Sequence, residues 1–172
     1  MLKRFYRARS GVAALEFALI LPLVLLGFVG ANEISSAVQV SQKVSQTAST
    51  VADLVAQAST ISNADETNIF AAANAIIFPY SSSGQSIVIS SIVDNGGGMG
   101  RVVWSDANLG EARAVGSTLP LPAGVITTGG SVILAEVHYS YTPAPAYVTN
   151  GAILIKSQFF SRPRRVANIP RV

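Results

Sequence analysis

An apolar run near the N-terminus constrains this chain more than any other feature. Residues 12–31 are all apolar or small, with the single exception of Glu16. A helix of about 20 residues, rising roughly 1.5 Å per residue, is as long as the roughly 30 Å hydrocarbon core of a bilayer is thick. We therefore expect a leader at residues 1–11, a transmembrane helix at residues 12–31 and an extracytoplasmic domain at residues 32–172.

The charges flank this run unequally. Of the 12 Lys and Arg residues, four lie in the leader and eight follow the run; of the nine acidic residues, all but Glu16 also follow it. The leader residues are Lys3, Arg4, Arg7 and Arg9. Because cytoplasmic flanks of membrane helices are rich in Lys and Arg, we expect a cytoplasmic N-terminus and an exported domain. The outer part is neutral, so the basic pI indicates topology and no nucleic-acid partner.

A cleaved secretory signal is the competing interpretation of the same run. Val29, Gly30 and Ala31 offer small residues at a spacing that suits a signal peptidase, whose product would begin at Asn32. However, the run is longer than the roughly 7 to 15 apolar residues of an ordinary signal, and it contains a carboxylate. These two features favour a retained anchor.

Glu16 is the most informative single residue in the run. An ionisable side chain at the centre of a membrane helix costs on the order of 2 to 3 kcal/mol, and less near an end. Such a residue usually has a partner, although a position close to the interface would also let the carboxylate reach water. Glu16 is therefore a candidate functional residue.

The local string around Glu16 resembles a known processing site. Arg9-Ser10-Gly11 is followed by Val12, by Glu16 five residues after the glycine, by Phe17 and by an apolar stretch to Pro22. This pattern is similar to the prepilin-peptidase site of Tad/Flp-type (type IVc) pilins, and in particular to the start of TadE/TadG-like minor pseudopilins. Four weaker strings also resemble this group, at residues 52–57, 104–105, 139–143 and 162–164.

The resemblance implies a function and a set of partners. It implies cleavage after Gly11, a new N-terminus at Val12 and a pairing role for Glu16 in assembly, with Phe17 in the recognised sequence and Pro22 as a kink in the helix. The expected partners are the prepilin peptidase, other pilin and pseudopilin subunits, the inner-membrane assembly platform and membrane lipid. The expected function is a minor subunit needed for pilus assembly in a bacterial inner membrane, with a periplasmic domain and a contribution to adhesion.

The rest of the sequence predicts an α+β domain that begins with helices. The residues at positions 37, 41, 44, 48, 51, 55 and 58 are small or apolar and recur every three or four residues, which extends the membrane helix outward. Ser62 and Asp65 form a capping-box pattern for a second helix to about Phe78. Its expected apolar face is Ile69, Ala72, Ala73, Ile76 and Ile77.

Strand patterns follow the second helix. Residues 86–93 and 101–105 flank Asp94-Asn95-Gly96-Gly97-Gly98 and predict a hairpin. Residues 106–130 are rich in glycine and proline and predict a long loop with one short strand. Residues 132–141 alternate as a half-buried strand that ends at Pro143 and Pro145, and residues 152–160 form the last strand. We expect a mainly antiparallel sheet of about four strands.

No residue pattern indicates an enzyme, a metal site or a cofactor. The chain has no cysteine and one histidine, His138, which we expect at the surface of a strand. A second hypothesis is a membrane-tethered module that binds a glycan or polymer through the loop at 106–130. Trp104, Tyr139 and Tyr141 could supply aromatic rings for it, although strand aromatics usually pack in the core. The basic tail at residues 162–171 suits solvated charge better than a binding surface.

Overall fold

The computed structural model describes residues 9–143 and 151–172, with side chains from Gly11 onward. It contains two long helices, α2 (Arg9–Gln57) and α3 (Asn63–Ile77), and a short 3-10 turn, η1 (Ser82–Gly84). The strands are β1 (Gln85–Asp94), β2 (Met99–Ala107), β3 (Thr118–Pro120), β4 (Ser131–Tyr141) and β5 (Ile153–Ser161). The predicted α+β class is confirmed. Lys3, Arg4, Arg7 and Pro145 lie outside the described residues.

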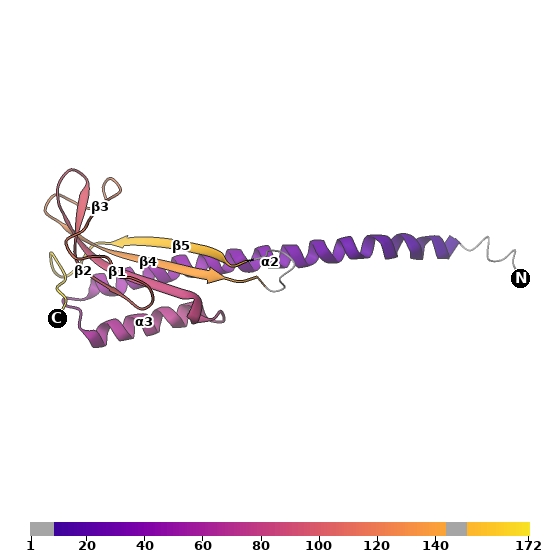
Figure 1. Ribbon diagram of the computed structural model, residues 1–172, viewed down its shortest axis with the longest axis horizontal. Coiled ribbons are helices and arrows are strands. Elements are labelled where there is room, and N and C mark those ends of the chain that lie inside the picture. Colours follow the sequence, from indigo (N-terminus) through magenta and orange to yellow (C-terminus); the bar gives the residue numbers. More distant parts are fainter. Residues whose placement is uncertain (1–8, 144–150) are drawn as a thin grey trace, which may run out of the picture.

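Helix α2 is one continuous helix of 49 residues, about 73 Å long. Its first half projects far from the domain and its second half lies along the sheet (Figure 1). Residues 11–28 are exposed, and burial begins at Val29 and Gly30. The predicted outward continuation of the membrane helix is therefore confirmed.

The buried stripe of α2 follows the predicted spacing with one shift. Val44, Ala48, Val51 and Val55 are fully buried as expected, but Ser41 is exposed and Val40 takes its place. Val40 follows Ala37 by three residues, which keeps the 3.6-residue period while presenting an apolar side chain to the sheet. The stripe packs mainly on β4 and β5 of its own domain.

Helix α3 starts where its sequence predicts. The Asp65 amide donates to Ser62 Oγ at 3.3 Å, and the Ser62 amide donates to Asp65 Oδ2 at 2.9 Å, which completes the capping box. The Ser62 hydroxyl, at 2.6 Å, and the Ser62 amide both donate to the Asp65 carboxylate and lower the pKa of Asp65. The helix ends at Ile77, one residue earlier than expected, because the residue before Pro79 favours an extended backbone.

The sheet has the order β3-β2-β1-β4-β5, and every neighbouring pair is antiparallel. The predicted hairpin joins β1 to β2, where Gly96, Gly97 and Gly98 all have positive φ, a region that glycine adopts without strain. The long loop supplies the short strand β3, which gives five strands in place of about four. Asp106 and Ala107 belong to β2 and not to this loop.

Strand β4 differs from its predicted half-buried character. One face points toward α2, with Ile133, Ala135, Val137, Tyr139 and Tyr141 all buried as expected. On the other face Val132 and Leu134 are also buried, because the loop around Leu119 to Ile126 folds over them. The alternation is visible only in the second half of the strand, where Glu136 and His138 are half-buried and Ser140 is exposed.

The C-terminal residues form a strap across the end of the domain away from the projecting helix. Ile169 is fully buried, and its carbonyl accepts a hydrogen bond from Trp104 Nε1 at 2.7 Å. The Ile61 amide donates to the Pro170 carbonyl at 3.0 Å, and the Val172 amide donates to the Ile61 carbonyl at 2.9 Å. The strap therefore joins the α2–α3 connection to β2.

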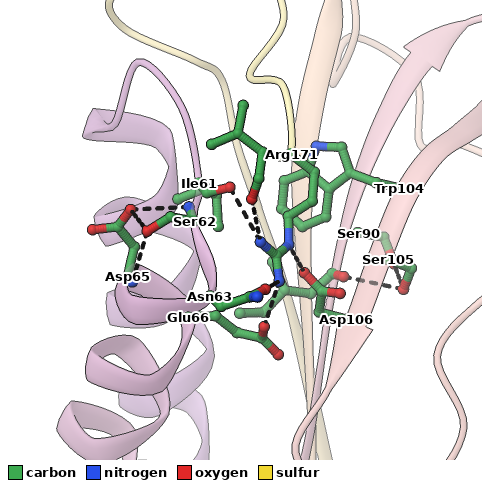
Figure 2. Close-up of polar contacts among 12 residues, drawn as sticks. Ile61, Ser62, Asn63, Asp65, Glu66, Ser90, Trp104, Ser105, Asp106 and Arg171 are labelled. Atoms are coloured by element: carbon green, nitrogen blue, oxygen red, sulfur yellow. Dashed lines mark hydrogen bonds and ion pairs between the residues drawn. The ribbon is translucent and has the colours of Figure 1, made fainter.

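Arg171 forms the ion pairs of this strap, with Glu66 on α3 and Asp106 on β2 (Figure 2). Its Nε donates to Asp106 Oδ2 at 2.6 Å, and its Nη2 donates to Glu66 Oε2 at 2.7 Å. The side chain is 20% exposed. Burial and the neighbouring Asp106 raise the pKa of Glu66, and Arg171 opposes that shift. The expectation of solvated tail charge is therefore wrong for Arg171, whose charge is used inside the domain.

Other basic residues of the tail are also bound within the chain. Arg162 donates to the carbonyls of Val125 and Gly124, at 3.0 and 2.7 Å. Arg164 pairs with Asp53 near the end of α2. Both guanidinium groups remain exposed at the surface. The basic side chains of the tail therefore form hydrogen bonds and ion pairs within the domain.

Val137→Asp tests the orientation of β4. Val137 is fully buried against the helix side of the core, so an unpaired carboxylate there should lower the free energy of unfolding by about 3 kcal/mol or more. Chemical denaturation measures the loss. Ser140→Asp is the matched control, because Ser140 is exposed on the same strand and should cost little. Equal stability of the two variants would contradict the assignment of the faces.

Arg171→Ala tests the strap. The change leaves Glu66 and Asp106 without their shared cation, and we expect a loss of about 2 kcal/mol or more in unfolding free energy at neutral pH. The loss should shrink at about pH 4, because Glu66, whose pKa is raised by burial and by the neighbouring Asp106, is then protonated and no longer repels Asp106. Arg165→Ala is the control, since Arg165 is an exposed tail residue. A loss independent of pH would contradict an ionic role for Arg171.

Candidate assembly site on the N-terminal helix

The N-terminal half of α2 carries every residue that the sequence singled out for processing and assembly. Gly11, Val12, Glu16, Phe17 and Pro22 all lie in the exposed segment of residues 11–28. Large apolar side chains are exposed around the whole helix there: Val12, Leu15, Phe17, Leu19, Ile20, Leu21, Leu23, Val24, Leu25, Leu26 and Phe28. A helix that is apolar on all faces requires a non-aqueous environment or other helices around it.

Among the described residues, α2 is the helix that is long and apolar enough to cross a membrane. None of its apolar window is buried inside the domain, which separates it from the core helix of a soluble protein. The single N-terminal apolar helix thus suggests membrane anchoring. A signal sequence near the N-terminus would also meet this test of length and composition. However, α2 continues without a break into the domain core, so cleavage after Ala31 would cut within the helix.

The Gly11–Val12 bond lies in the first turn of α2. The amides of the first four helical residues, from Arg9 to Val12, have no intrahelical carbonyl to bind. A Cβ built on Gly11 meets no atom within 4 Å, so a larger residue fits there without disturbing the fold.

Glu16 lies one helical turn after Val12 and on the same face of α2. It is exposed, and no side chain in the described part of the chain forms an ion pair or hydrogen bond with it. Within the described residues, the Glu16 carboxylate therefore has no charged or hydrogen-bonding side chain beside it. Pro22 follows inside the helix, where it removes the partner of the Ala18 carbonyl while the helix continues on both sides.

A contact that the sequence did not reveal lies where α2 meets the domain. Glu33, two residues past the apolar run, is 6% exposed and accepts a hydrogen bond from the Tyr141 hydroxyl. Burial, together with the hydrogen bond to Glu33, raises the pKa of Tyr141 to about 12, so the phenol remains a donor at physiological pH. The centroids of the Tyr80 and Tyr141 rings lie 6.3 Å apart, and the rings are nearly perpendicular. The sheet is thereby fixed to α2 at the base of the projecting segment.

The aromatic residues considered for a glycan site are in the core. Trp104, Tyr139 and Tyr141 are all buried. The loop from residue 106 borders a surface groove of about 450 Å³ with walls from Leu119, Pro122 and Phe160. Arg113 also borders this groove, but it forms a two-point ion pair with Glu136, at 2.6 and 2.7 Å. The aromatic rings of that hypothesis are therefore not available at the surface.

The polar side of the sheet holds the single histidine. His138 is half-buried beside Glu136, Lys156, Ser157 and Gln158, around a shallow hollow of about 520 Å³. Within residues 9–143 and 151–172, no group of three or more His, Cys, Asp or Glu residues is placed to hold a metal ion. The adjacent carboxylates Asp65 and Glu66 serve the helix cap and the strap, as described above.

Comparison with known proteins concerns the same helix. A family model described as TadE-like protein matches residues 11–53, which are 43 of the 172 residues. No curated protein and no solved structure matches the chain. The matched segment starts at Gly11, includes Val12, Glu16, Phe17 and Pro22, and ends within the buried part of α2. The resemblance found in the sequence is thus confirmed over residues 11–53, where the chain is similar to the TadE-like family, consistent with a TadE-like protein of Tad pilus systems.

Proposed function

We propose that this chain is a minor pilin-like subunit that serves the assembly of a Tad/Flp-type pilus and, through the pilus, surface adhesion. The observation that carries the proposal is Glu16, an exposed carboxylate that no side chain in the described part of the chain pairs with. It lies on an apolar helix one turn after the Gly11–Val12 bond, inside the segment that matches the TadE-like family. Before assembly, α2 holds the subunit in a bacterial inner membrane with the domain in the periplasm.

The proposed mechanism is structural and depends on a new N-terminus. A prepilin peptidase cleaves after Gly11 and frees the amine of Val12, which is largely protonated at neutral pH because α-amino groups have a pKa near 8. In a filament of low dielectric constant, this cation pairs with Glu16 of a neighbouring subunit. The pair sets the register between adjacent helices, and other pilin subunits and the inner-membrane assembly platform supply the partners.

The leader charges predict the orientation of the anchor. With Lys3, Arg4, Arg7 and Arg9 on the cytoplasmic side, a reporter that is active only outside the cytoplasm should work when fused after Val172. The matched control is the same fusion with these four residues changed to Gln, which should reduce the exported signal. Activity of a cytoplasm-specific reporter at the same junction would contradict the orientation.

Glu16→Gln and Gly11→Leu separate assembly from processing. Glu16→Gln should insert normally, because a neutral amide is less costly in lipid than a carboxylate, but it should be lost from sheared pili since the charge pair is gone. Gly11→Leu should block cleavage itself and leave the leader attached. Leu19→Gln places the same amide elsewhere on the exposed helix and controls for polarity alone.

Three measurements read these variants: the intact mass, the membrane fraction and the recovery in sheared pili. A mature chain that begins at Val12 supports pilin-type processing, whereas a start at Asn32 indicates a signal peptide and a start at Met1 an uncleaved anchor. Normal piliation with Glu16→Gln would rule out the pairing role and leave Glu16 as a recognition element for the peptidase or a residue that reaches water.

A further inference from the structure

The end of the domain nearest the projecting helix exposes four large apolar side chains. They are Ile34 on α2, Phe78 between α3 and β1, and Ile153 and Leu154 at the start of β5. We call these four residues the proximal rim. Phe78 is 75% exposed, the largest value among the exposed large apolar side chains in the described residues.

The contacts of Tyr141 place the rim residues at the same end of the domain. Tyr141 bonds Glu33, and its neighbours on β5 are Ile153, directly opposite, and Leu154, which pairs with Ser140. The Tyr80 ring packs on Tyr141, which brings the turn after Phe78 to the same end of the domain (Figure 1). Ile34, Ile153 and Leu154 therefore lie close to Glu33, and the turn after Phe78 approaches the same end of the domain from α3, whose Ile76 carbonyl accepts a hydrogen bond from Lys43 Nζ at 3.0 Å.

The distance from this level to the apolar run is short. Glu33 follows Ala31 by two residues, or about 3 Å along a helix, and Val29 and Gly30 are half-buried. The headgroup layer on each side of a hydrocarbon core is roughly 5 to 8 Å thick. Because α2 continues without a linker, a domain anchored by residues 12–31 holds the rim at the depth of this layer.

The charge distribution agrees with this position. Among the described residues, 67–93, 139–143 and 151–155 supply the turn after α3 and the proximal ends of β1, β4 and β5, and none of these stretches contains Asp, Glu, Lys, Arg or His. On α2, Glu33 is the only charged residue between Glu16 and Lys43, and it is buried. The ion pairs of Arg164 and Arg171 lie at the opposite end. In the described part of this end the exposed side chains are mainly apolar, and the Lys43 ammonium is bound to the Ile76 carbonyl. Such a surface next to a membrane anchor matches the chemistry of a lipid interface.

We propose that the proximal rim seats the domain in the headgroup layer of the membrane that anchors α2. The inference rests on the proposed membrane anchoring. It assigns Phe78, Ile34, Ile153 and Leu154 to lipid contact, in addition to the transmembrane segment. The rim holds the domain upright against the bilayer until the subunit leaves the membrane for the filament.

The absence of cysteine from the sequence makes this surface directly measurable. Full-length Phe78→Cys and Leu154→Cys proteins are labelled with an environment-sensitive fluorophore and reconstituted in vesicles of phosphatidylethanolamine and phosphatidylglycerol. Nitroxide lipids then quench the label from the headgroup or from the middle of the acyl chain. Val115→Cys is the distal control, because Val115 is equally exposed but lies in the loop beside Val102. Leu19→Cys reports the anchor.

The headgroup nitroxide should quench the labels at Phe78 and Leu154 strongly and leave the label at Val115 bright. The acyl-chain nitroxide should quench the label at Leu19. If Leu19 is not quenched, membrane anchoring itself fails. If Leu19 is quenched while both rim labels behave like Val115, the rim proposal is overturned and the anchor stands. Rim labels that ignore the nitroxides but quench one another at higher protein density would assign this surface to a second copy and also overturn it.

Discussion

Helix α2 must satisfy two environments with one unbroken set of backbone hydrogen bonds. Residues 11–28 are apolar on every face, whereas the second half presents a narrow stripe of Val and Ala to the sheet and polar residues to water. A helix satisfies its backbone internally, so it can pass from one environment to the other without exposing unpaired amides. Between Val29 and Glu33 the helix passes from the exposed apolar segment to the part that packs in the domain. Because the helix is continuous, this boundary fixes where the sheet and α3 lie relative to the projecting segment.

Two contacts fix the domain to α2 at opposite ends of the buried half. At the membrane-proximal end, the Tyr141 hydroxyl binds Glu33, and at the distal end the strap ties Ala56 and Ile61 through backbone hydrogen bonds from Arg164 and Val172. The small residues of the stripe allow β4 and β5 to approach the helix closely, but small side chains alone hold a helix weakly against rotation or sliding. The polar contacts at the ends add the directional restraint that the apolar stripe lacks.

The parts of the fold that sequence analysis predicted are those with local signals. The Ser62–Asp65 box, the glycines after Asp94 and the alternation before Tyr141 each depend on neighbouring residues, and each predicted its element to within a few positions. The missed features depend on contacts across the chain. Arg171 meets Glu66 and Asp106, and Glu33 meets Tyr141, at separations of 65 to 108 residues. The second buried face of β4 likewise requires a loop that has no strand pattern.

The candidate site could be predicted from the sequence because Glu16 is a charged residue in an apolar segment. Such a residue is recognised without knowledge of the tertiary structure. The same reasoning explains why Glu16 matters in the proposed assembly. Lipid chains are as apolar as leucine, so the hydrophobic effect does not draw exposed helices together within a bilayer. Association requires close packing and polar pairing instead. Gly27 and Gly30 leave open space on the helix surface for close packing, and in the described part of the exposed segment Glu16 is the side chain that can supply a charge.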